Sequence, residues 1–467
     1  MNIFIKVTML FLLIIPSFAY AGTPYYVDPS QTDPFENGSF EHPWNSILDV
    51  NSHRFNDGDD IYFKVNTYIK TPVKLSITWN GTKNDRVIIG AYSGENNFTL
   101  NNNSRPIFDG GFSVPGVDSG LIEYKHGEGY VTIQDISVKN VSGIGICIDG
   151  WVSPGGHTSI YNTVKNCYIE NTTYQGILLA RTSYSSALNN VIIRASYQRA
   201  PGAGLEITGG NDETVSHHNT ASGNTVSWCF EGIGAYLGTR YATIENNVVF
   251  DCRSYHLYSA NSRDIIIRNN IAYETQNQLD GDDRDLLIGV DAEGHIPGFI
   301  DVTGHTEITG NYLAGGSCGI SLISNSNDIG LFQSYNIVSD NVIVDCDYNF
   351  SFRKNTSGWE GNVFKNNVSQ IFTPGMKHID NDSPYGVTWE TNFFNTSVSG
   401  EASKSADYLT VLSKTSDWRS LPAGAVNISF FNFTKEGQST YYSINEPNAL
   451  ETQSQIDSPV NLRIIAP

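Results

Sequence analysis

The chain has 467 residues, a length that allows two or three domains or one elongated repeat fold. Lys and Arg number 28 against 48 Asp and Glu, and this net charge of −20 argues against nonspecific binding to nucleic acid or to an anionic membrane, which needs a basic surface. Aromatic residues make up 12% of the chain, which excludes a disordered composition, and 43 glycines with few charges are typical of an all-β protein rich in turns.

The N-terminus has the pattern of a secretory signal peptide. Lys6 precedes an apolar run at residues 7–15, and Ala19-Tyr20-Ala21 forms a small-x-small site before Gly22. We therefore expect cleavage near Ala21, removal of residues 1–21 and a secreted or periplasmic mature chain. The alternative is an uncleaved anchor, but the apolar run is short for a membrane span, and no later segment approaches the ~20 apolar residues that a span needs.

Short motifs after the signal peptide resemble the N-terminal segment of pectate-lyase-like β-helix proteins. They read Tyr25-Tyr26-Val27-Asp28-Pro29, Asn37-Gly38-Ser39, Pro43-Trp44, Gly58-Asp59-Asp60-Ile61-Tyr62 and Ile88-Ile89-Gly90-Ala91-Tyr92. In that superfamily such a segment forms a first strand, a short capping helix and the first coils. The resemblance extends to about residue 394 and implies the fold. It does not choose an activity, because the superfamily holds polysaccharide lyases, glycoside hydrolases, uronate epimerases and noncatalytic surface proteins.

An asparagine followed by alternating apolar residues recurs through the middle of the chain. It stands at Asn166, Asn190, Asn224, Asn247, Asn270, Asn311, Asn341 and Asn367, and Asp135 fits one step earlier. The smallest spacing is 23 residues, and wider spacings indicate insertions into a fixed, strand-based unit. A propeller blade would need about 40 residues, and a sandwich has no fixed repeat. The pattern predicts an all-β, right-handed parallel β-helix at about residues 60–395 with an N-terminal cap, in which the asparagines stack as a hydrogen-bonded ladder.

A second strand follows each asparagine, and its alternation predicts which side chains point outward. These strands begin at Gly145, Gly176, Gly204, Gly232, His256, Leu287, Gly319 and Asn349. Positions two and four are mostly apolar and should face the core, so positions one, three and five should face out. Position three reads Cys147, Leu178, Glu206, Gly234, Tyr258, Gly289, Ser321 and Ser351, and position five reads Asp149, Ala180, Thr208, Tyr236, Ala260, Asp291, Ile323 and Arg353.

This register brings four chemically useful side chains together on neighbouring coils. Glu206, Tyr236, His256 and Tyr258 are the predicted catalytic residues. Gly232, Gly234 and Gly289 would leave an open platform for a sugar ring, and the insertions at residues 209–222 and 276–285 would wall a groove for a linear polymer. The plain alternatives are a solvated Glu206, tyrosines that only stack, and a structural His256. The adjacent pair His217-His218 is interpreted as a surface loop rather than a metal site.

Further side chains are predicted to bind substrate: Arg181, Arg240, Asp291 and Arg353. The arginines could neutralise a substrate carboxylate, although an arginine beside a sheet can simply be solvated. A polysaccharide lyase that cleaves a uronate-containing polymer by β-elimination is the main hypothesis, because Tyr258 or His256 could act as the base. A β-helix glycoside hydrolase, which needs two carboxyl groups, and a noncatalytic carbohydrate-binding surface protein stay open. We expect a polysaccharide as the partner and a monomeric chain.

Two other motifs concern metal and sulfur. Asp280, Asp282, Asp283 and Asp285 form the densest acidic run, which could supply oxygen ligands to calcium or be a solvated loop. Cys229 and Cys252 stand at the same place in adjacent coils, so the sequence allows either a disulfide or a stack of buried thiols.

The last segment, residues 396–467, loses the asparagine repeat. Residues 407–418 could form a short helix and residues 459–465 a strand. We expect an irregular segment that caps the open end of the β-helix or serves as a linker.

Overall fold

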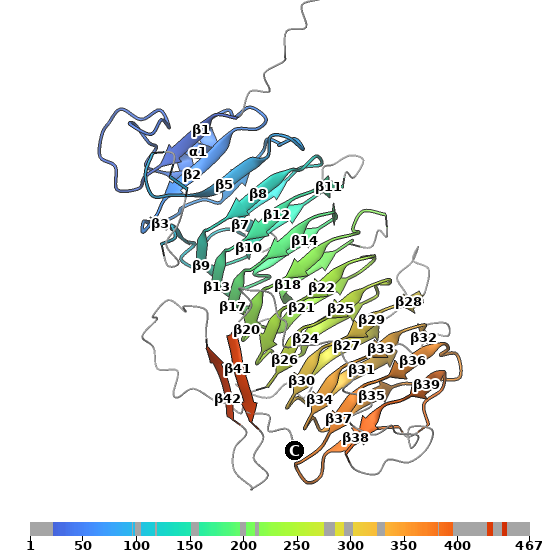
Figure 1. Cartoon of the computed structure of the whole chain (residues 1–467). Coiled ribbons are helices and arrows are strands. Elements are labelled where there is room, and N and C mark those ends of the chain that lie inside the picture. Colours follow the sequence, from blue (N-terminus) through green and yellow to red (C-terminus); the bar gives the residue numbers. More distant parts are fainter. Residues whose placement is uncertain are drawn as a thin grey trace, which may run out of the picture.

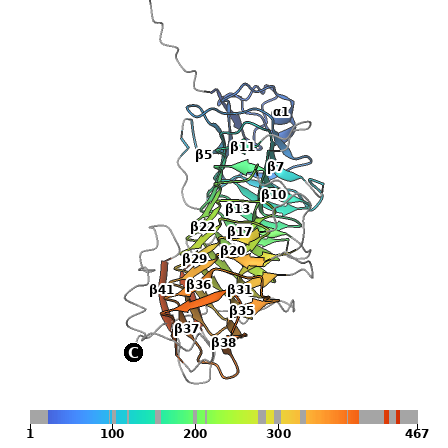
Figure 2. The ribbon, with the colours of Figure 1, turned by 90° about the vertical axis from the view of Figure 1, so that its right-hand side faces the viewer.

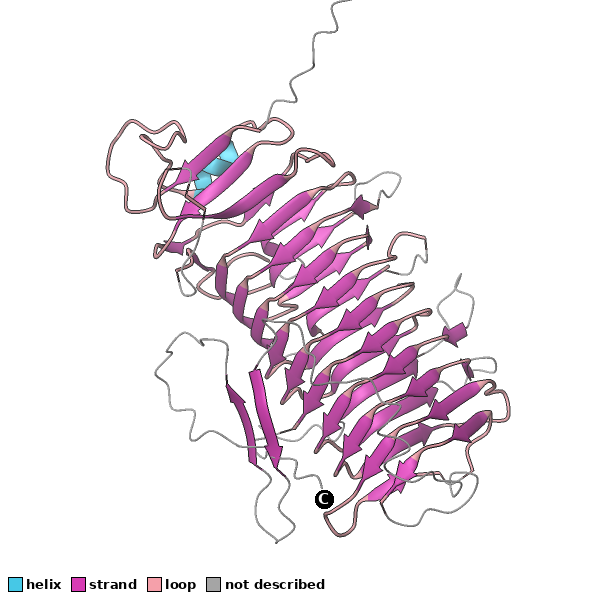
Figure 3. Ribbon diagram, in the orientation of Figure 1, coloured by secondary structure: helices cyan, strands magenta, loops and turns pink. Residues whose placement is uncertain are grey.

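Stacked β-strands make up almost the whole of the described chain. The computed structural model describes residues 22–95, 97–98, 104–116, 119–150, 158–196, 202–210, 214–274, 285–293, 302–324, 332–381 and 383–395, and the strands at 427–432 and 441–445. The strands of successive coils pair in parallel and form three long sheets along one axis (Figure 1, Figure 3). The expected right-handed parallel β-helix is confirmed.

Each coil passes through the three sheets in the same order, which we call sheet A, sheet B and sheet C. Sheet A has 13 strands: β1 (Pro24–Val27), β2 (Asp60–Lys64), β5 (Val87–Tyr92), β8 (Val131–Gln134), β12 (Thr163–Lys165), β16 (Ser186–Leu188), β19 (Thr220–Ser222), β22 (Thr243–Glu245), β25 (Ile266–Arg268), β29 (Glu307–Thr309), β33 (Ile337–Ser339), β36 (Asn362–Lys365) and β39 (Val387–Glu390).

Sheet B follows sheet A after a short turn and has 12 strands. They are β3 (Tyr68–Lys70), β6 (Ile107–Asp109), β9 (Ser137–Val141), β13 (Tyr168–Thr172), β17 (Val191–Ala195), β20 (Thr225–Ser227), β23 (Val248–Phe250), β26 (Ile271–Tyr273), β30 (Tyr312–Ala314), β34 (Val342–Val344), β37 (Val368–Gln370) and β40 (Phe393–Phe394).

Sheet C closes each coil and has 11 strands. They are β4 (Leu75–Ile77), β7 (Gly120–Lys125), β10 (Ile144–Asp149), β14 (Ile177–Ala180), β18 (Ala203–Thr208), β21 (Glu231–Tyr236), β24 (Tyr255–Ala260), β27 (Leu286–Ala292), β31 (Cys318–Ser324), β35 (Tyr348–Arg353) and β38 (Lys377–Ile379). Figure 2 shows the stack from a second side.

Four small features complete the described structure. The helix α1 (Ile47–Ser52) begins at Ser46, whose hydroxyl accepts a hydrogen bond from the Asp49 amide at 3.3 Å, and it buries Ile47 and Val50 in the core at the N-terminal end. Three two-stranded sheets pair β11 (Ser159–Ile160) with β15 (Thr182–Ser183), β28 (Val302–Gly304) with β32 (Phe332–Ser334), and, antiparallel, β41 (Asn427–Asn432) with β42 (Tyr441–Asn445). The helix expected at 407–418 and the strand expected at 459–465 lie outside the described residues.

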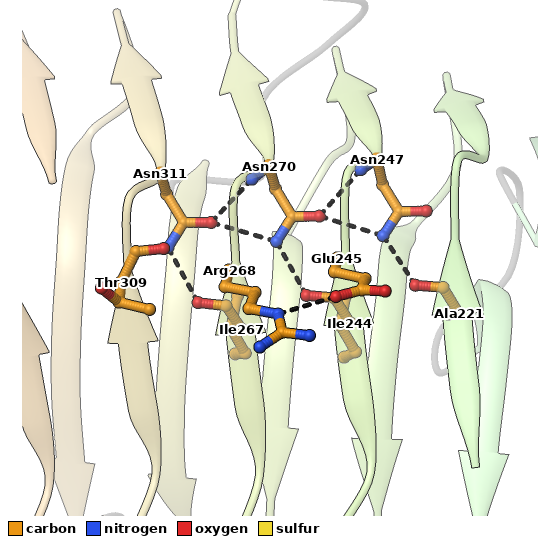
Figure 4. A network of polar contacts seen from close by, with 9 residues as sticks. All are labelled: Ala221, Ile244, Glu245, Asn247, Ile267, Arg268, Asn270, Thr309 and Asn311. Atoms are coloured by element: carbon orange, nitrogen blue, oxygen red, sulfur yellow. Dashed lines mark hydrogen bonds and ion pairs between the residues drawn. The ribbon is translucent and has the colours of Figure 1, made fainter. Parts of the chain in front are cut away.

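The asparagine ladder forms at the turn between sheets A and B, as predicted. The side-chain oxygen of Asn270 accepts hydrogen bonds from the backbone and the side chain of Asn247 at 2.9 and 3.0 Å (Figure 4). The same pair of bonds links Asn224 to Asn247. The ladder runs from Asn190 to Asn392.

Two members of the predicted ladder, Asn166 and Asp135, are off by one residue, since the register of β9 with β13 places Ile136 beside Cys167. The side chain of Asn190 accepts from the amide of Cys167, so Cys167 occupies the ladder position in that coil. Asn166 is the residue before it and has a left-handed backbone with φ of 54°, as do Asn189, Asn246 and Asn269. Asparagine is favoured at the ladder position because its side chain forms hydrogen bonds, and at the preceding position because it tolerates positive φ. The sequence pattern therefore does not distinguish the two positions.

The cysteines are buried thiols. All six are free, including Cys229 and Cys252, which lie on adjacent coils in the core. Of the two alternatives that the sequence allowed, the structure therefore has the thiol stack rather than the disulfide.

Candidate functional site

The outer face of sheet C carries a cluster of carboxylates and tyrosines over four adjacent strands, β18 to β27. Glu206 lies opposite Gly234, and Gly234 lies opposite Tyr258. The residues before them, Leu205, Ile233 and Leu257, are buried in the main core. Side chains alternate along a strand, so Glu206 and Tyr258 point outward as the period-two pattern predicts. We call the following set the sheet C site: Glu206, Glu231, Tyr236, Tyr255, Tyr258, Asp291 and Glu293.

Tyr236 lies flat across its own strand. A Cβ added at Gly234 would overlap the ring of Tyr236, and the Tyr236 hydroxyl donates to Glu231 Oε2 at 2.7 Å. A Cβ at Gly289 would likewise overlap the ring of Tyr255. The prediction that these glycines leave an open platform for a sugar is therefore wrong, because each missing side chain makes room for a tyrosine of the protein itself.

Tyr255 and Tyr258 form a buried pair that joins two carboxylates. Their rings stack with centroids 3.8 Å apart, and only 3% and 1% of these residues are exposed. The Tyr258 hydroxyl donates to Glu293 Oε1 at 2.6 Å and lies 3.2 Å from Asp291 Oδ2, which Tyr255 also reaches at 3.2 Å. The oxygens of Asp291 and Glu293 are thus at most 5.8 Å apart, the sum of their two distances to Tyr258.

Glu206 is the partly exposed carboxyl group at the centre of this face. Its Oε2 accepts a hydrogen bond from Gln175 Nε2 at 2.6 Å. The surrounding protein raises the pKa of Glu206 above that of a free glutamate, because desolvation of the charged form outweighs the Gln175 hydrogen bond. Glu206 therefore keeps its proton to a higher pH than an exposed glutamate does.

The two tyrosines that the sequence singled out are donors rather than bases. Burial raises the pKa of Tyr236 well above its ordinary value, and the nearby charges of Glu231, Glu206 and Glu293 raise it further. Burial and the charge of Asp291 do the same to Tyr258. A tyrosine base would need a neighbouring cation to lower its pKa, but these hydroxyls face carboxylates, so they stay protonated.

His256 does not belong to the site, and its predicted outward orientation is wrong. The side chain is fully buried, and its Nε2 lies 2.9 Å from Glu274 Oε1 at the end of β26. The corresponding position in the preceding coil is Gly232, where an added Cβ would meet Val249 of the core. Position one thus points inward like position two, because the in–out alternation breaks at the start of these strands. In the next coil, the consecutive residues Leu287 and Ile288 likewise both lie in the main core. Although Glu274 lies close, burial dominates and lowers the His256 pKa to about 4.

The predicted substrate-binding residues do not gather in one place. Arg181 is paired through both ends of its guanidinium with Asp149, at 2.9 and 2.5 Å. Arg353 is exposed on β35, five strands from Glu206, which is roughly 24 Å at ~4.8 Å per strand. Arg240 lies at the corner between sheets C and A, 3.5 Å from Asp264. Asp291 is buried and belongs to the sheet C site.

The predicted metal site and the groove wall at residues 276–285 fall largely outside the described residues, whereas most of the wall at residues 209–222 is described. Asp280, Asp282 and Asp283 are among the residues left undescribed, and so are 211–213 and 276–284 of the two loops. Asp285 precedes β27, and among the described residues no group of three or more His, Cys, Asp or Glu side chains could hold a metal ion. The calcium hypothesis stays a prediction. No helix in the described part of the chain is long and apolar enough to cross a membrane.

Three members of the site were missed from the sequence. Glu231 and Tyr255 stand at the first residue of their strands, one place before the predicted start, and Glu293 stands just beyond the end of β27. The only signal was their position beside predicted strands. They belong to the site because they contact the long side chains of Tyr236 and Tyr258. The alternation pattern predicts only whether a side chain faces out, and not which residues it contacts.

No protein-family model and no curated protein matches the chain. Among solved structures, it is similar to the GH136 lacto-N-biosidase from Eubacterium ramulus, with 14% identity, 80% of this chain and 68% of that chain covered, and a TM-score of 0.55. It is also similar to PfbA, a surface adhesin of Streptococcus pneumoniae, with 13% identity, 72% and 82% covered, and a TM-score of 0.53. Pectate lyase Pel9A matches with 17% identity, 90% and 94% covered, and a TM-score of 0.45. By its fold, the chain is a parallel β-helix protein, like the solved structures that it resembles.

Proposed function

We propose that the chain is a glycoside hydrolase that cleaves a glycan on the outer face of sheet C, with Glu206 as the general acid. The observation that carries the proposal is a partly exposed carboxyl group with a raised pKa, surrounded by further carboxylates. A glycosidase needs one carboxyl group that holds its proton until it can donate it to the leaving oxygen, and a second that assists attack at the sugar carbon.

The contacts of Glu206 suit the role of the acid. Gln175 binds Oε2, so the proton is held on Oε1, the oxygen that Gln175 does not bind. We assign the second carboxyl group to Glu293, which is exposed. The charges of Glu206 and Glu293 both raise the pKa of Tyr236, so both carboxyl groups lie near its hydroxyl. Tyr236 and Tyr258 then position the carboxylates by donating hydrogen bonds to Glu231 and Glu293.

β-Elimination, the main hypothesis from the sequence, has less support on this face. It needs a cation to neutralise the uronate carboxylate and a base for the C5 proton. Of the cations on the described outer face of sheet C, Lys74 and Lys125 pair with Glu123, Arg181 pairs with Asp149, and the exposed Arg353 lies on β35, two strands beyond β27. A negative polymer would also meet the exposed carboxylate of Glu293, so we infer that the substrate is uncharged near the bond that is cleaved.

The structural neighbours are compatible with this proposal and do not decide it. One is named a lacto-N-biosidase and the other a surface adhesin. The same fold therefore serves an enzyme and a binding protein, and the function must be argued from the site.

A glycan panel tests the proposal. Each polysaccharide is incubated with the wild type, Glu206→Gln and Glu293→Gln, and both reducing ends and absorbance near 235 nm are followed. We expect reducing ends without new absorbance, and a loss of about 10²–10⁴-fold in kcat for Glu206→Gln, the usual contribution of an acid catalyst. Glu307→Gln is the matched control, because Glu307 is an exposed carboxylate on sheet A.

The outcomes separate the three functions. Absorbance at 235 nm would identify a lyase and overturn the proposal. The absence of any product over the whole panel would favour a binding protein. Equal turnover of Glu206→Gln and Glu307→Gln would remove Glu206 from the reaction.

A further inference from the structure

The corner where the chain turns from sheet C into sheet A repeats one pattern over five consecutive coils. An aromatic ring is followed two residues later by a hydroxyl. The sequences are Tyr130-Val131-Thr132, Tyr161-Asn162-Thr163, Tyr184-Ser185-Ser186, His218-Asn219-Thr220 and Tyr241-Ala242-Thr243. We call the rings of Tyr130, Tyr161, Tyr184, His218 and Tyr241 the corner ladder, and the side chains of Thr132, Thr163, Ser186, Thr220 and Thr243 the hydroxyl row.

The corner ladder is a regular stack along the axis of the β-helix. Its successive ring centroids are 5.1, 5.2, 5.0 and 5.0 Å apart, with interplanar angles of 15–28°. Rings in van der Waals contact lie roughly 3.5–4 Å apart, so a separation of about 5 Å means that each ring is displaced sideways over the next. Each ring therefore covers only part of its neighbour.

The ladder keeps bulky residues in an unfavourable backbone conformation at the surface. All five have φ between 53° and 58°, a left-handed region that glycine or asparagine adopts more readily. Tyr161, Tyr184 and Tyr241 are nevertheless 40%, 44% and 46% exposed. Backbone strain of this kind persists where the side chain has a use that a smaller residue could not serve.

The hydroxyl row runs beside the ladder on sheet A. Thr163, Thr220 and Thr243 are partly exposed and belong to one continuous register through β12, β16, β19 and β22. The next coil ends the pattern, with Asp264 and Ile266 in place of the ring and the hydroxyl. The surface thus has a defined length of five coils, which is roughly 20 Å at ~4.8 Å per coil.

The charge of this surface differs from that of the whole chain. No carboxylate stands at any of the ten positions, although the chain carries a net charge of −20. Arginines flank its two ends, with Arg86 over the ring of Tyr130 at 6.0 Å and Arg240 over the ring of Tyr241 at 5.2 Å. A neutral partner meets no charge repulsion along the strip.

We propose that the corner ladder and the hydroxyl row bind an extended, uncharged glycan that lies along the axis of the β-helix. The exposed parts of the aromatic rings pack against the apolar C–H faces of sugar rings, and hydroxyls of the row exchange hydrogen bonds with sugar hydroxyls. A repeat of about 5 Å per coil presents a ring to each successive sugar of an extended chain. The hydroxyls of Ser186, Thr220 and Thr243 stand beside these rings, whereas Thr132 is buried and both Thr132 and Thr163 accept hydrogen bonds from Arg86. This surface is separate from the sheet C site, and the inference does not depend on the proposed hydrolysis.

A purely structural ladder is the competing explanation, and the chain offers a matched control for it. Tyr335 stands at the same corner, with φ of 56°, 48% exposure and a ring contact to His305 at 5.2 Å. It lies outside the five-coil pattern, and Ile337 takes the place of the hydroxyl. If the rings only stabilise the turn, then replacing Tyr335 or a ladder tyrosine affects stability alone.

Affinity electrophoresis tests the inference. The full chain is run through native gels cast with soluble xyloglucan, galactomannan or mixed-linkage β-glucan, and through gels with polygalacturonate or alginate. The variants are Tyr161→Gly with Tyr184→Gly, Thr220→Val with Thr243→Val, and the control Tyr335→Gly. Glycine adopts positive φ without strain, so the tyrosine variants should fold, and circular dichroism melting confirms this.

We expect at least one neutral polysaccharide to retard the wild type. The double tyrosine variant should bind about tenfold or more weakly, and the valine variant should also bind more weakly, while Tyr335→Gly is unchanged. Equal retardation of the double tyrosine variant and the wild type, retardation by the acidic polymers alone, or no retardation in any neutral gel would overturn the inference.

Discussion

Glu206 couples the chemistry of the site to the stability of the fold. Its pKa is raised by burial, so the folded state prefers the protonated form. The stabilisation from this group is complete below the pKa of an unfolded glutamate, about 4.5, and is lost as the pH rises through the raised pKa of the folded state. At alkaline pH Glu206 is therefore ionised and poorly solvated, and it lacks the proton that a general acid must donate.

Glu206→Gln should consequently stabilise the protein while it removes activity. Glutamine resembles the protonated acid and cannot ionise. We expect the variant to melt at a higher temperature than the wild type at pH 8 and at the same temperature near pH 4. Thermal melts at the two pH values measure this. A variant that melts lower at pH 8 would show that the ionised carboxylate is well accommodated, against the raised pKa.

His256 is a structural residue of the core, and its replacement should affect stability alone. His256→Ala removes a fully buried ring and its contact with Glu274, so we expect a loss of about 2–4 kcal/mol in the free energy of unfolding. Turnover per folded molecule should stay at the wild-type level. Denaturant titration measures the free energy of unfolding, and an active-fraction assay measures the turnover per folded molecule. A folded variant without activity would show that His256 takes part in catalysis.

The pH dependence of stability offers a second view of His256. Its pKa of about 4 lies below the value of 6.5 for a free histidine, so the unfolded chain takes up the proton first. The contribution of this group is complete above pH 6.5 and is lost as the pH falls toward 4. The stability of His256→Ala should accordingly decline less steeply than that of the wild type over this range.

The asparagine ladder is the element that holds successive coils in register. The side chain of Asn247 donates to Ala221 O and Asn270 Oδ1 and accepts from Asn224, all within the core. Asn247→Ala leaves backbone groups of the turn unsatisfied, and we expect a loss of about 2–4 kcal/mol.

The neighbouring residue provides a control with the opposite expectation. Asn246 has φ of 56°, and its replacement by glycine relieves the left-handed strain. Urea denaturation of Asn246→Gly should show a free energy of unfolding equal to or above that of the wild type. A similar loss in both variants would mean that the turn as a whole, rather than the ladder bonds, determines the stability.

The strands and turns were predictable because each is marked by a short sequence pattern that recurs in successive coils. The period-two alternation correctly placed Glu206 and Tyr258 on the outer face, and the recurring asparagine located the turn between sheets A and B. The break in the in–out alternation at the start of the sheet C strands was not predictable, because it turns His256 inward without any change in composition. The corner ladder had a signal, an aromatic residue two places before a hydroxyl, but its spacing is irregular because insertions separate the coils.

At the scale of the whole molecule, the β-helix supplies a straight scaffold on which two surfaces run along the same axis (Figure 1). Sheet C concentrates carboxylates, and the corner ladder is uncharged. This division suits a chain that holds one stretch of a neutral glycan and cleaves another. The sequence showed the net charge of −20 but not its distribution, because that depends on which outward positions meet across coils.

The masses of the products from a defined oligosaccharide test the central claim most directly. Hydrolysis adds one water across the cleaved bond, so the masses of the two fragments should together exceed that of the substrate by one water. Elimination adds nothing, and one fragment carries a double bond instead. The account predicts fragments that contain the added water, formed by the wild type and by Glu307→Gln but not by Glu206→Gln. Fragments whose masses add up to that of the substrate would contradict it.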